Sequence, residues 1–229
     1  MESFNELIIT MGGFALTHFA FSSGPLRKPL AKMMGAKGFS IFYSIVSLVL
    51  FFWAVSAYID APHVELWPLS MVAGIFAVVI MLPACVFIIT GYFTPNPVSL
   101  IGVKHVLKPA QGITKITRHP VMWGLSFWAL AHIFANGDVA SIIFFGLFLL
   151  VALGGAAHLD MRTRKRLGEK YDILCKESSF VPFAAIIAGR TSVSVGEIGW
   201  LQVLGGVVVF GVLLAAHGPV IGPDLLSRF

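Results

Sequence analysis

Three histidines interrupt the most apolar parts of this chain. His18 and His132 lie within long runs that lack Asp, Glu, Lys and Arg, whereas His119 follows Arg118 directly at the start of such a run. An ionisable side chain at membrane depth is costly, so it indicates function. The two deep imidazoles either bond a backbone carbonyl or a hydroxyl on a neighbouring helix, or they ligate a cofactor between helices.

Arg118 and His119 form a separate candidate site. His119 precedes His132 by 13 residues, which at about 100° per residue leaves about 220° around a helix, so the two point to different faces. A guanidinium and an imidazole at a helix N-terminus suit an anionic group, such as a haem propionate, a lipid phosphate or a carboxylate. The alternative is a helix cap that anchors the chain at lipid headgroups. The same cytoplasmic mouth is expected to include Trp123, Arg162, Arg166 and Glu169.

The composition indicates a membrane protein. The 229 residues are 57% hydrophobic and only 12% charged, and six uncharged stretches approach or exceed the roughly 20 residues that a bilayer span needs. We expect an all-α, polytopic integral membrane protein that forms one domain over residues 1–229. Its six transmembrane helices are predicted near residues 5–24, 39–59, 69–92, 119–136, 139–160 and 199–217.

The basic residues predict the orientation of these helices. All Lys and Arg residues except Arg228 fall in the segments after the first, third and fifth predicted helices. Positive charges stay on the cytoplasmic side, so both termini are predicted to lie outside. The net charge of +5 then reflects topology, and we expect no nucleic-acid binding. The first helix is preceded by Glu2 and Glu6 rather than by basic residues, so it is not expected to be a removable signal peptide.

Several motifs are distinctive in combination: Thr17-His-Phe19, Leu66-Trp-Pro68, the run from Gly112 to Pro120, Trp128 to His132 with Asn136-Gly-Asp138, and Phe180 to Ala185. Together they resemble the NnrU family of bacterial membrane proteins. The family includes the 15-cis-ζ-carotene isomerases, which are membrane enzymes that hold haem b on two histidines. The resemblance implies that His18 and His132 ligate the haem iron, with His119 in a supporting or structural role. If haem is bound, basic residues of the cytoplasmic mouth such as Arg118 and His119 are expected to pair with its propionates.

The resemblance also implies redox-gated haem chemistry, either cis–trans isomerisation of a polyene or a role in nitrogen-oxide metabolism. The expected partners are the lipid bilayer and an apolar polyene or lipid-like substrate, and the expected location is a bacterial cytoplasmic membrane. A more distant similarity connects the Arg118-His-Pro120 motif, Leu167 to Tyr171 and Val181-Pro182 to isoprenylcysteine carboxyl methyltransferases. It implies binding of S-adenosylmethionine. A third possibility is a non-enzymatic assembly factor for nitrite and nitric oxide respiration.

Helix geometry puts a constraint on the haem hypothesis. His18 lies 7 residues before Pro25, and His132 lies 12 residues after Pro120. These separations place His18 about 10 Å and His132 about 18 Å above the inner membrane boundary. Two axial ligands of one iron need similar depths, so the predicted helices must be tilted or offset if both histidines are to reach it.

Overall fold

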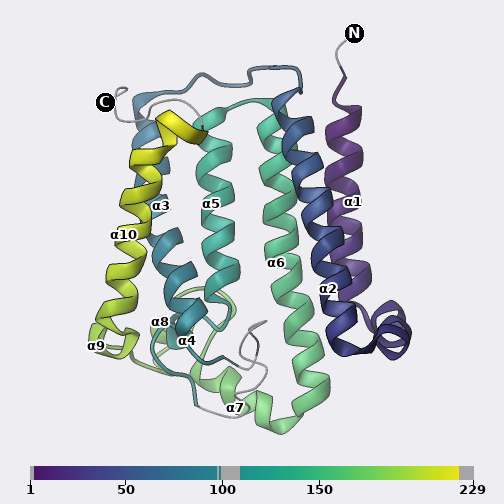
Figure 1. Cartoon of the computed structure of the whole chain (residues 1–229). Coiled ribbons are helices and arrows are strands. Elements are labelled where there is room, and N and C mark those ends of the chain that lie inside the picture. The colour runs from purple at the N-terminus through teal and green to yellow at the C-terminus, as the bar shows by residue number, and fades with distance from the viewer. Residues whose placement is uncertain (1–2, 97, 99–108, 222–229) are drawn as a thin grey trace. The chain divides into compact units, whose positions relative to one another are not determined.

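The structure is a computed structural model that describes residues 3–96, 98 and 109–221, and in this part of the chain the regular secondary structure is helical, with no strand (Figure 1). The predicted all-α class is confirmed. The helices are α1 (Asn5–Ser22), α2 (Gly24–Ile59), α3 (Met71–Phe93), α4 (Ile113–Ile116), α5 (Pro120–Asn136), α6 (Val139–Leu167), α7 (Glu169–Glu177), α8 (Ala184–Ile187), α9 (Val195–Ile198) and α10 (Trp200–Ala216), followed by a π-helical turn at His217–Ile221.

Four of these helices are long and apolar enough to cross a membrane. They are α2, α3, α6 and the helical segment Trp200–Pro219 that contains α10. They indicate a multi-pass membrane protein. The two other predicted spans correspond to α1 and α5, which have 18 and 17 residues and are therefore about 27 and 26 Å long.

Two helices extend beyond their predicted ends. The segment after α1, predicted as a loop, is helical from Gly24, and only Gly35, with φ 73° and ψ 161°, breaks the helix before the membrane-length part of α2. Pro25 favours this early start, because proline is well suited to the first turn of a helix. At the other end of the chain, α6 continues to Leu167 through its basic last turn, where Lys and Arg interact favourably with the helix dipole.

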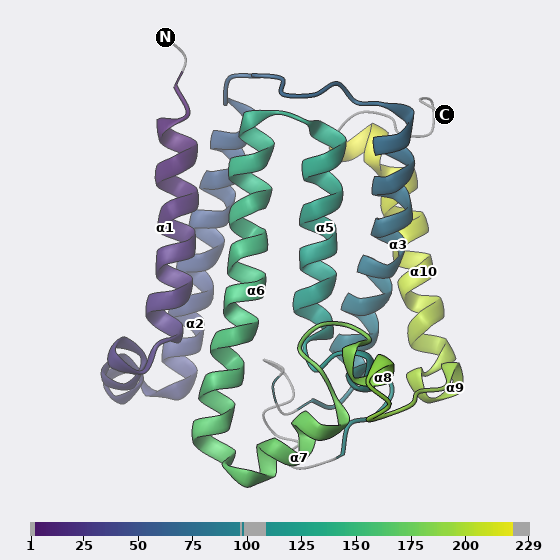
Figure 2. The ribbon, with the colours of Figure 1, turned by 180° about the vertical axis from the view of Figure 1, so that it is seen from behind.

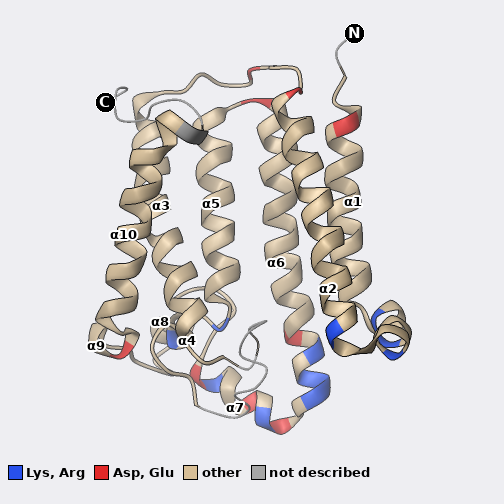
Figure 3. Ribbon diagram, in the orientation of Figure 1, with Lys and Arg blue, Asp and Glu red and all other residues tan. Residues whose placement is uncertain are grey.

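The described chain divides into two compact units. Unit 1 comprises Met1–Leu69 and His132–Val151, and unit 2 comprises Ser70–Ala131 and Ala152–Phe229. Helix α5 begins in unit 2 and ends in unit 1, whereas α6 begins in unit 1 and ends in unit 2. Figure 3 shows Lys and Arg on the first part of α2 in unit 1, and on the last part of α6 and on α7 in unit 2.

In unit 1, α1 lies beside α2, as Figures 1 and 2 both show. Trp53 of α2 donates its indole N–H to the Glu6 carboxylate of α1 over 2.7 Å. The segment before α3 is attached to the α5–α6 turn, because the backbone N–H groups of Leu66 and Trp67 both donate to the Gly137 carbonyl. Gly137 has φ +65°, and a Cβ there would collide with the Trp67 backbone carbonyl, so the turn needs glycine.

In unit 2, α3 packs closely against α10 and α5. A Cβ on Gly206 of α10 would lie 2.6 Å from the Cα of Val86, and one on Gly124 of α5 would lie 2.8 Å from the Ala84 carbonyl oxygen. Small residues allow helix backbones to approach this closely within a membrane. Near the first turn of α5, the core is formed by Phe87, Ile113 and Ile116 with partly buried side chains around them.

Candidate functional site

A single carboxylate organises the polar interior of unit 2. Asp160 of α6 accepts hydrogen bonds from the Arg118 guanidinium at its Oδ2, from Nε over 2.8 Å and from Nη2 over 2.6 Å. Its Oδ1 accepts from His119 Nε2 and from the Tyr171 hydroxyl of α7, each over 2.5 Å. We call these four residues the Asp160 cluster. Three separate segments of the chain thus meet at one carboxylate.

The backbone before α5 is fixed by side chains and by the loop after α7. The Thr117 hydroxyl donates to the Phe180 carbonyl over 2.7 Å and also accepts from the His119 backbone N–H. The Arg118 N–H donates to the Ser179 carbonyl, and its carbonyl accepts from the Asn96 side chain. Pro120 then begins α5. These bonds fix the backbone of Arg118 and His119 just before the first helical turn.

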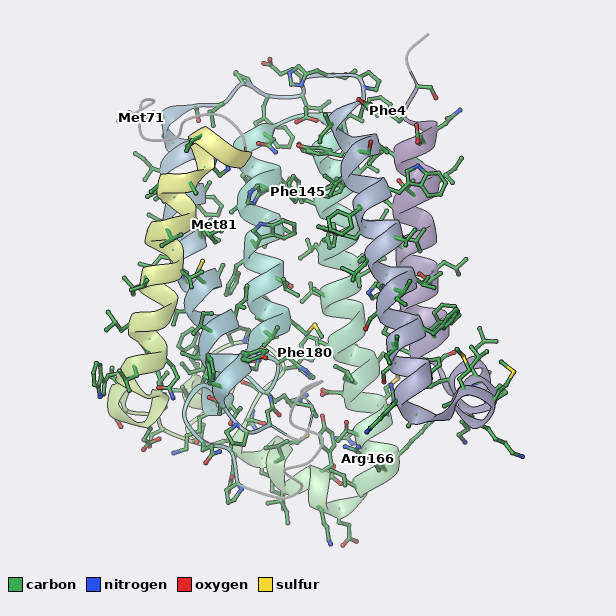
Figure 4. All side chains as sticks on the ribbon, in the orientation of Figure 1. Phe4, Met71, Met81, Phe145, Arg166 and Phe180 are labelled. Atoms are coloured by element: carbon green, nitrogen blue, oxygen red, sulfur yellow. The ribbon has the colours of Figure 1, made fainter. Side chains whose placement is uncertain are left out.

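An aromatic ring packs on the cluster. Phe180, labelled in Figure 4, lies edge-on to the His119 ring with centroids 5.3 Å apart. The Arg118 guanidinium carbon is 5.9 Å from the centroid of the same ring, which is a cation–π distance. Trp123 of α5 donates its indole N–H to the Phe180 carbonyl over 2.8 Å and so fixes this residue in place. The His119 side chain is only 1% exposed as a result.

The charges of the cluster are well compensated. The Asp160 carboxylate faces the Arg118 guanidinium, with 17% and 13% of the two side chains exposed. Burial raises the pKa of Tyr171 well above its ordinary value, and the hydrogen bond to Asp160 raises it further. The phenol therefore stays protonated and donates. Because the carboxylate only accepts hydrogen bonds, His119 must carry its proton on Nε2, which fixes the imidazole tautomer when the ring is neutral.

The structure brings together two of the predicted site residues and gives them an internal partner. Arg118 and His119 do share one site, but both bind Asp160. Sequence reasoning missed Asp160 and Tyr171 as members of the site. The available signal was the position of Asp160, which is the one acidic residue between the uncharged stretch of α6 and its basic last turn.

His18 lies in unit 1 and has a backbone partner. Its Nδ1 is 2.9 Å from the Phe14 carbonyl oxygen one turn earlier in α1. Since a carbonyl only accepts, Nδ1 carries the proton, which leaves Nε2 as an acceptor or ligand atom in the neutral ring. The ring contacts Phe14 at 4.1 Å and the edge of Tyr43 at 5.4 Å between centroids.

His132 also lies in unit 1, but in different surroundings. Its ring is stacked on Phe145 of α6 with centroids 4.7 Å apart, and Phe145, labelled in Figure 4, contacts Tyr58 of α2 at 5.7 Å. His18 contacts Tyr43 of the same helix. Tyr43 and Tyr58 are 15 residues apart on α2, or about 22 Å along its axis. The two histidines therefore lie at different levels of unit 1.

Four phenylalanine rings connect the two histidines. From His18 the contacts run through Phe14 to Phe148, Phe144 and Phe145, with 5.1 Å between the centroids of successive phenylalanine rings, and end at His132. Bonds from a metal to imidazole are about 2 Å long, so two axial ligands of one iron bring their ring nitrogens within about 4 Å. The structure does not bring His18 and His132 together in this way, and the pair does not fit a single haem b.

In residues 3–96, 98 and 109–221, no group of three or more His, Cys, Asp or Glu side chains is placed to hold a metal ion. Of the other residues predicted at the cytoplasmic mouth, Glu169 starts α7 and is exposed, whereas the Trp123 indole donates to the Phe180 carbonyl.

Comparisons with known proteins identify relatives over most of the chain. The family model described as "NnrU protein" matches residues 6–225. The chain is 32% identical over 185 residues to the chloroplastic 15-cis-zeta-carotene isomerase of Arabidopsis thaliana, covering 77% of this chain and 49% of that protein. It is 32% identical over 184 residues to the Zea mays protein of the same name, with the same coverage. The chain thus spans about half the length of these relatives. No solved structure matches it.

Proposed function

Because the chain belongs to the NnrU family, we propose that it is a membrane-embedded isomerase that interconverts cis and trans double bonds of an apolar polyene. The observation that carries this proposal is the 32% identity, over 77% of the chain, to proteins named as ζ-carotene isomerases. The physical setting agrees with such a substrate. A hydrocarbon polyene partitions into the bilayer, and the long apolar helices of this protein are suited to the same environment.

We propose the Asp160 cluster as the functional centre of this isomerase. Ionisable side chains beside hydrocarbon are expensive, and they are retained where they act. His119 is held by Asp160 in one orientation and one tautomer, which is what a histidine that handles a proton or orients a ligand requires. Arg118 balances the charge of the carboxylate and Tyr171 supplies a further donor. Since the His119 side chain is only 1% exposed, His119 and Asp160 are both proposed as positioning residues of this centre.

Haem b has no step in this proposal, because His18 and His132 lie at different levels of unit 1.

The methyltransferase alternative has a specific difficulty. The acidic residue that precedes the Leu167 to Tyr171 segment is Asp160. It already accepts four hydrogen bonds within the protein, so it is not available to the amino group of S-adenosylmethionine.

We further propose six membrane spans, with α1 and α5 as the two shortest, and both termini on the outer side of a bacterial cytoplasmic membrane. Support comes from the basic residues, which gather on the first part of α2 and on the last part of α6 and α7 (Figure 3).

The proposal is tested with the purified full chain in lipid nanodiscs and 15-cis-ζ-carotene as substrate, in the dark. We expect conversion to the trans isomer above the rate in empty nanodiscs, measured by chromatography. His119→Gln and Asp160→Asn should each reduce the rate at least tenfold. Asp172→Asn is the matched control, because Asp172 is an exposed carboxylate paired with Arg164 on the same part of the chain.

Two results would contradict the proposal. One is wild-type conversion no faster than in empty nanodiscs. The other is full activity in both His119→Gln and Asp160→Asn, which would move the functional centre away from the Asp160 cluster. Heat released on titration of the protein with S-adenosylmethionine would favour the methyltransferase alternative instead.

A further inference from the structure

The first part of α2 forms a short helix of its own. It begins at Gly24, where the Arg27 N–H donates to the Ser23 carbonyl, and it ends where Gly35 adopts φ 73° and ψ 161°. We call residues 24–34 the basic helix. Figures 1 and 2, which view the molecule from opposite sides, both show this coil end-on beside the end of α1. Within unit 1 its axis therefore runs across the direction of α1 and of the membrane-length part of α2.

The sequence of the basic helix divides its surface into an apolar half and a basic half. At about 100° per residue, side chains four positions apart form rows along a helix. Two adjacent rows consist only of apolar residues: Pro25, Pro29, Met33, Leu26, Leu30 and Met34. The three basic residues, Arg27, Lys28 and Lys32, lie on the other half. Met33 and Lys28, for example, point about 140° apart.

Much of the apolar half is uncovered. Met33 is 75% exposed and Leu26 is 46% exposed, whereas Leu30 and Ala31 are partly buried. The basic helix thus contacts the rest of unit 1 on the side of Leu30 and Ala31. The side with Met33 and Leu26 is left without a covering partner in the part of the chain that the structure describes.

Arg27 joins the basic helix to the rest of α2. Its guanidinium carbon lies 5.8 Å from the centroid of the Phe39 ring, which is a cation–π distance, and Phe39 is buried beyond the break at Gly35. Lys28 and Lys32 are both exposed, and none of the ion pairs among the described residues involves them. Two lysine charges are therefore presented outward from a helix whose orientation is fixed.

The surface of this helix matches a lipid bilayer. A helix with apolar side chains on one half and basic side chains on the other lies in the plane of a membrane interface, with its apolar half among the acyl chains. The exposed apolar surface also continues on the next part of α2, where Ile41 and Ile45 are 61% and 56% exposed on a helix long enough to span a membrane. Lysines at the interface attract lipids whose headgroups carry net negative charge.

We propose that the basic helix binds anionic phospholipids. Leu26 and Met33 insert among the acyl chains, while Lys28 and Lys32 bind the phosphate groups. A zwitterionic headgroup carries its own positive charge beside the phosphate, so the two lysines favour the anionic lipid. This binding role is independent of the isomerase proposal, because it involves no turnover and no residue of the Asp160 cluster.

The test measures which lipid surrounds the basic helix in the full chain. The two free cysteines are replaced by Cys85→Ala and Cys175→Ser, and a small fluorophore such as bimane is attached through Met33→Cys. Nanodiscs contain equal parts of phosphatidylglycerol and phosphatidylcholine, and only one of the two lipids has brominated acyl chains. Because bromine quenches only a fluorophore that it contacts, the ratio of quenching in the two preparations measures local enrichment. We expect brominated phosphatidylglycerol to quench about threefold more strongly.

Combining Lys28→Gln with Lys32→Gln should bring this ratio close to one. The matched control combines Lys165→Gln with Lys170→Gln, which removes the same charge from exposed positions on α6 and α7 and should leave the ratio unchanged. Circular dichroism and the melting temperature confirm that each variant is folded.

Three results would overturn the proposal. One is equal quenching by the two lipids when all the lysines are present, and another is an unchanged ratio in the Lys28 and Lys32 variant. The third is quenching by neither lipid, because the apolar half would then face protein, such as a second copy of this chain. None of these readouts depends on isomerase activity, so a failure of the proposed function would leave the lipid preference intact.

Discussion

His119 and Asp160, 41 residues apart in the sequence, meet at 2.5 Å between Nε2 and Oδ1. Oδ2 of the same carboxylate accepts a hydrogen bond from Arg118. Two consecutive residues before α5 therefore bind the two oxygens of one side chain on α6. This contact joins the start of one helix to the end of the next within unit 2. Asp160 thus takes the position beside Arg118 and His119 that an external anion would occupy at this helix N-terminus.

Replacing Asp160 should destabilise unit 2 strongly. Asp160→Asn leaves the Arg118 guanidinium without its counter-charge, and breaking a buried ion pair in this way typically costs about 3–5 kcal/mol. We expect a clearly lower melting temperature by differential scanning fluorimetry. Asp172→Asn, which disrupts the exposed pair with Arg164 at 3.1 Å, should have little effect. Similar melting temperatures for the two variants would show that the Asp160 cluster contributes little to stability.

Tyr171 should make stability sensitive to alkaline pH. Burial first, and then its bond to Asp160, raise the pKa of Tyr171, so the folded state retains a proton that the unfolded state releases near pH 10. The stabilisation is complete below that pH and declines as the pH rises above it. We expect Tyr171→Phe to cost about 1–2 kcal/mol at pH 8, and the difference from wild type to shrink above pH 10. A constant difference from pH 8 to pH 11 would be inconsistent with this mechanism.

Two glycines of α10 should respond in opposite ways to alanine. A Cβ on Gly206 would lie 2.6 Å from the Cα of Val86 on α3, whereas nothing lies within 4 Å of one on Gly211. Gly206→Ala should therefore push α10 from α3 and lower the melting temperature. Gly211→Ala should match the wild type or exceed it, because alanine favours a helix by about 1 kcal/mol over glycine. If Gly206→Ala proves neutral, the close α3–α10 contact is absent in the membrane.

The separation of His18 and His132 makes a spectroscopic prediction. After haem-sufficient expression, the purified chain should lack the absorbance spectrum of an iron held by two imidazoles, because the rings contact residues at different levels of unit 1. A bis-imidazole Soret spectrum that disappears in both His18→Ala and His132→Ala would refute this. It would also mean that α1 and α5 rearrange to hold the haem.

The charge distribution predicts the location of the C-terminus. A reporter enzyme that is active only outside the cytoplasm should be active when fused after Phe229, and a fusion within α7 should be inactive. The reason is that the basic residues of α6 and α7 favour the cytoplasmic side. The opposite pattern of activities would invert the proposed topology.

The sequence by itself determined the helical class and the apolar helices, and it indicated Arg118 and His119 as one candidate site. These depend on local properties, namely hydropathy over about 20 residues and the cost of ionisable groups among apolar neighbours. The extended start of α2 was not predicted, because the basic residues after α1 were assigned to a loop between two uncharged stretches, whereas Gly35 alone breaks an otherwise continuous helix.

Only the tertiary structure decided which residues meet. The partner of Arg118 and His119 is Asp160, and Tyr171 joins it from a separate helix. Sequence spacing carries no information about contacts across 41 or 42 positions. The same holds for His18 and His132, which look equivalent as isolated histidines in apolar runs. Their environments differ because the rotation and offset of α1, α2, α5 and α6 are set by side-chain packing, and packing is a property of the folded chain rather than of any one segment.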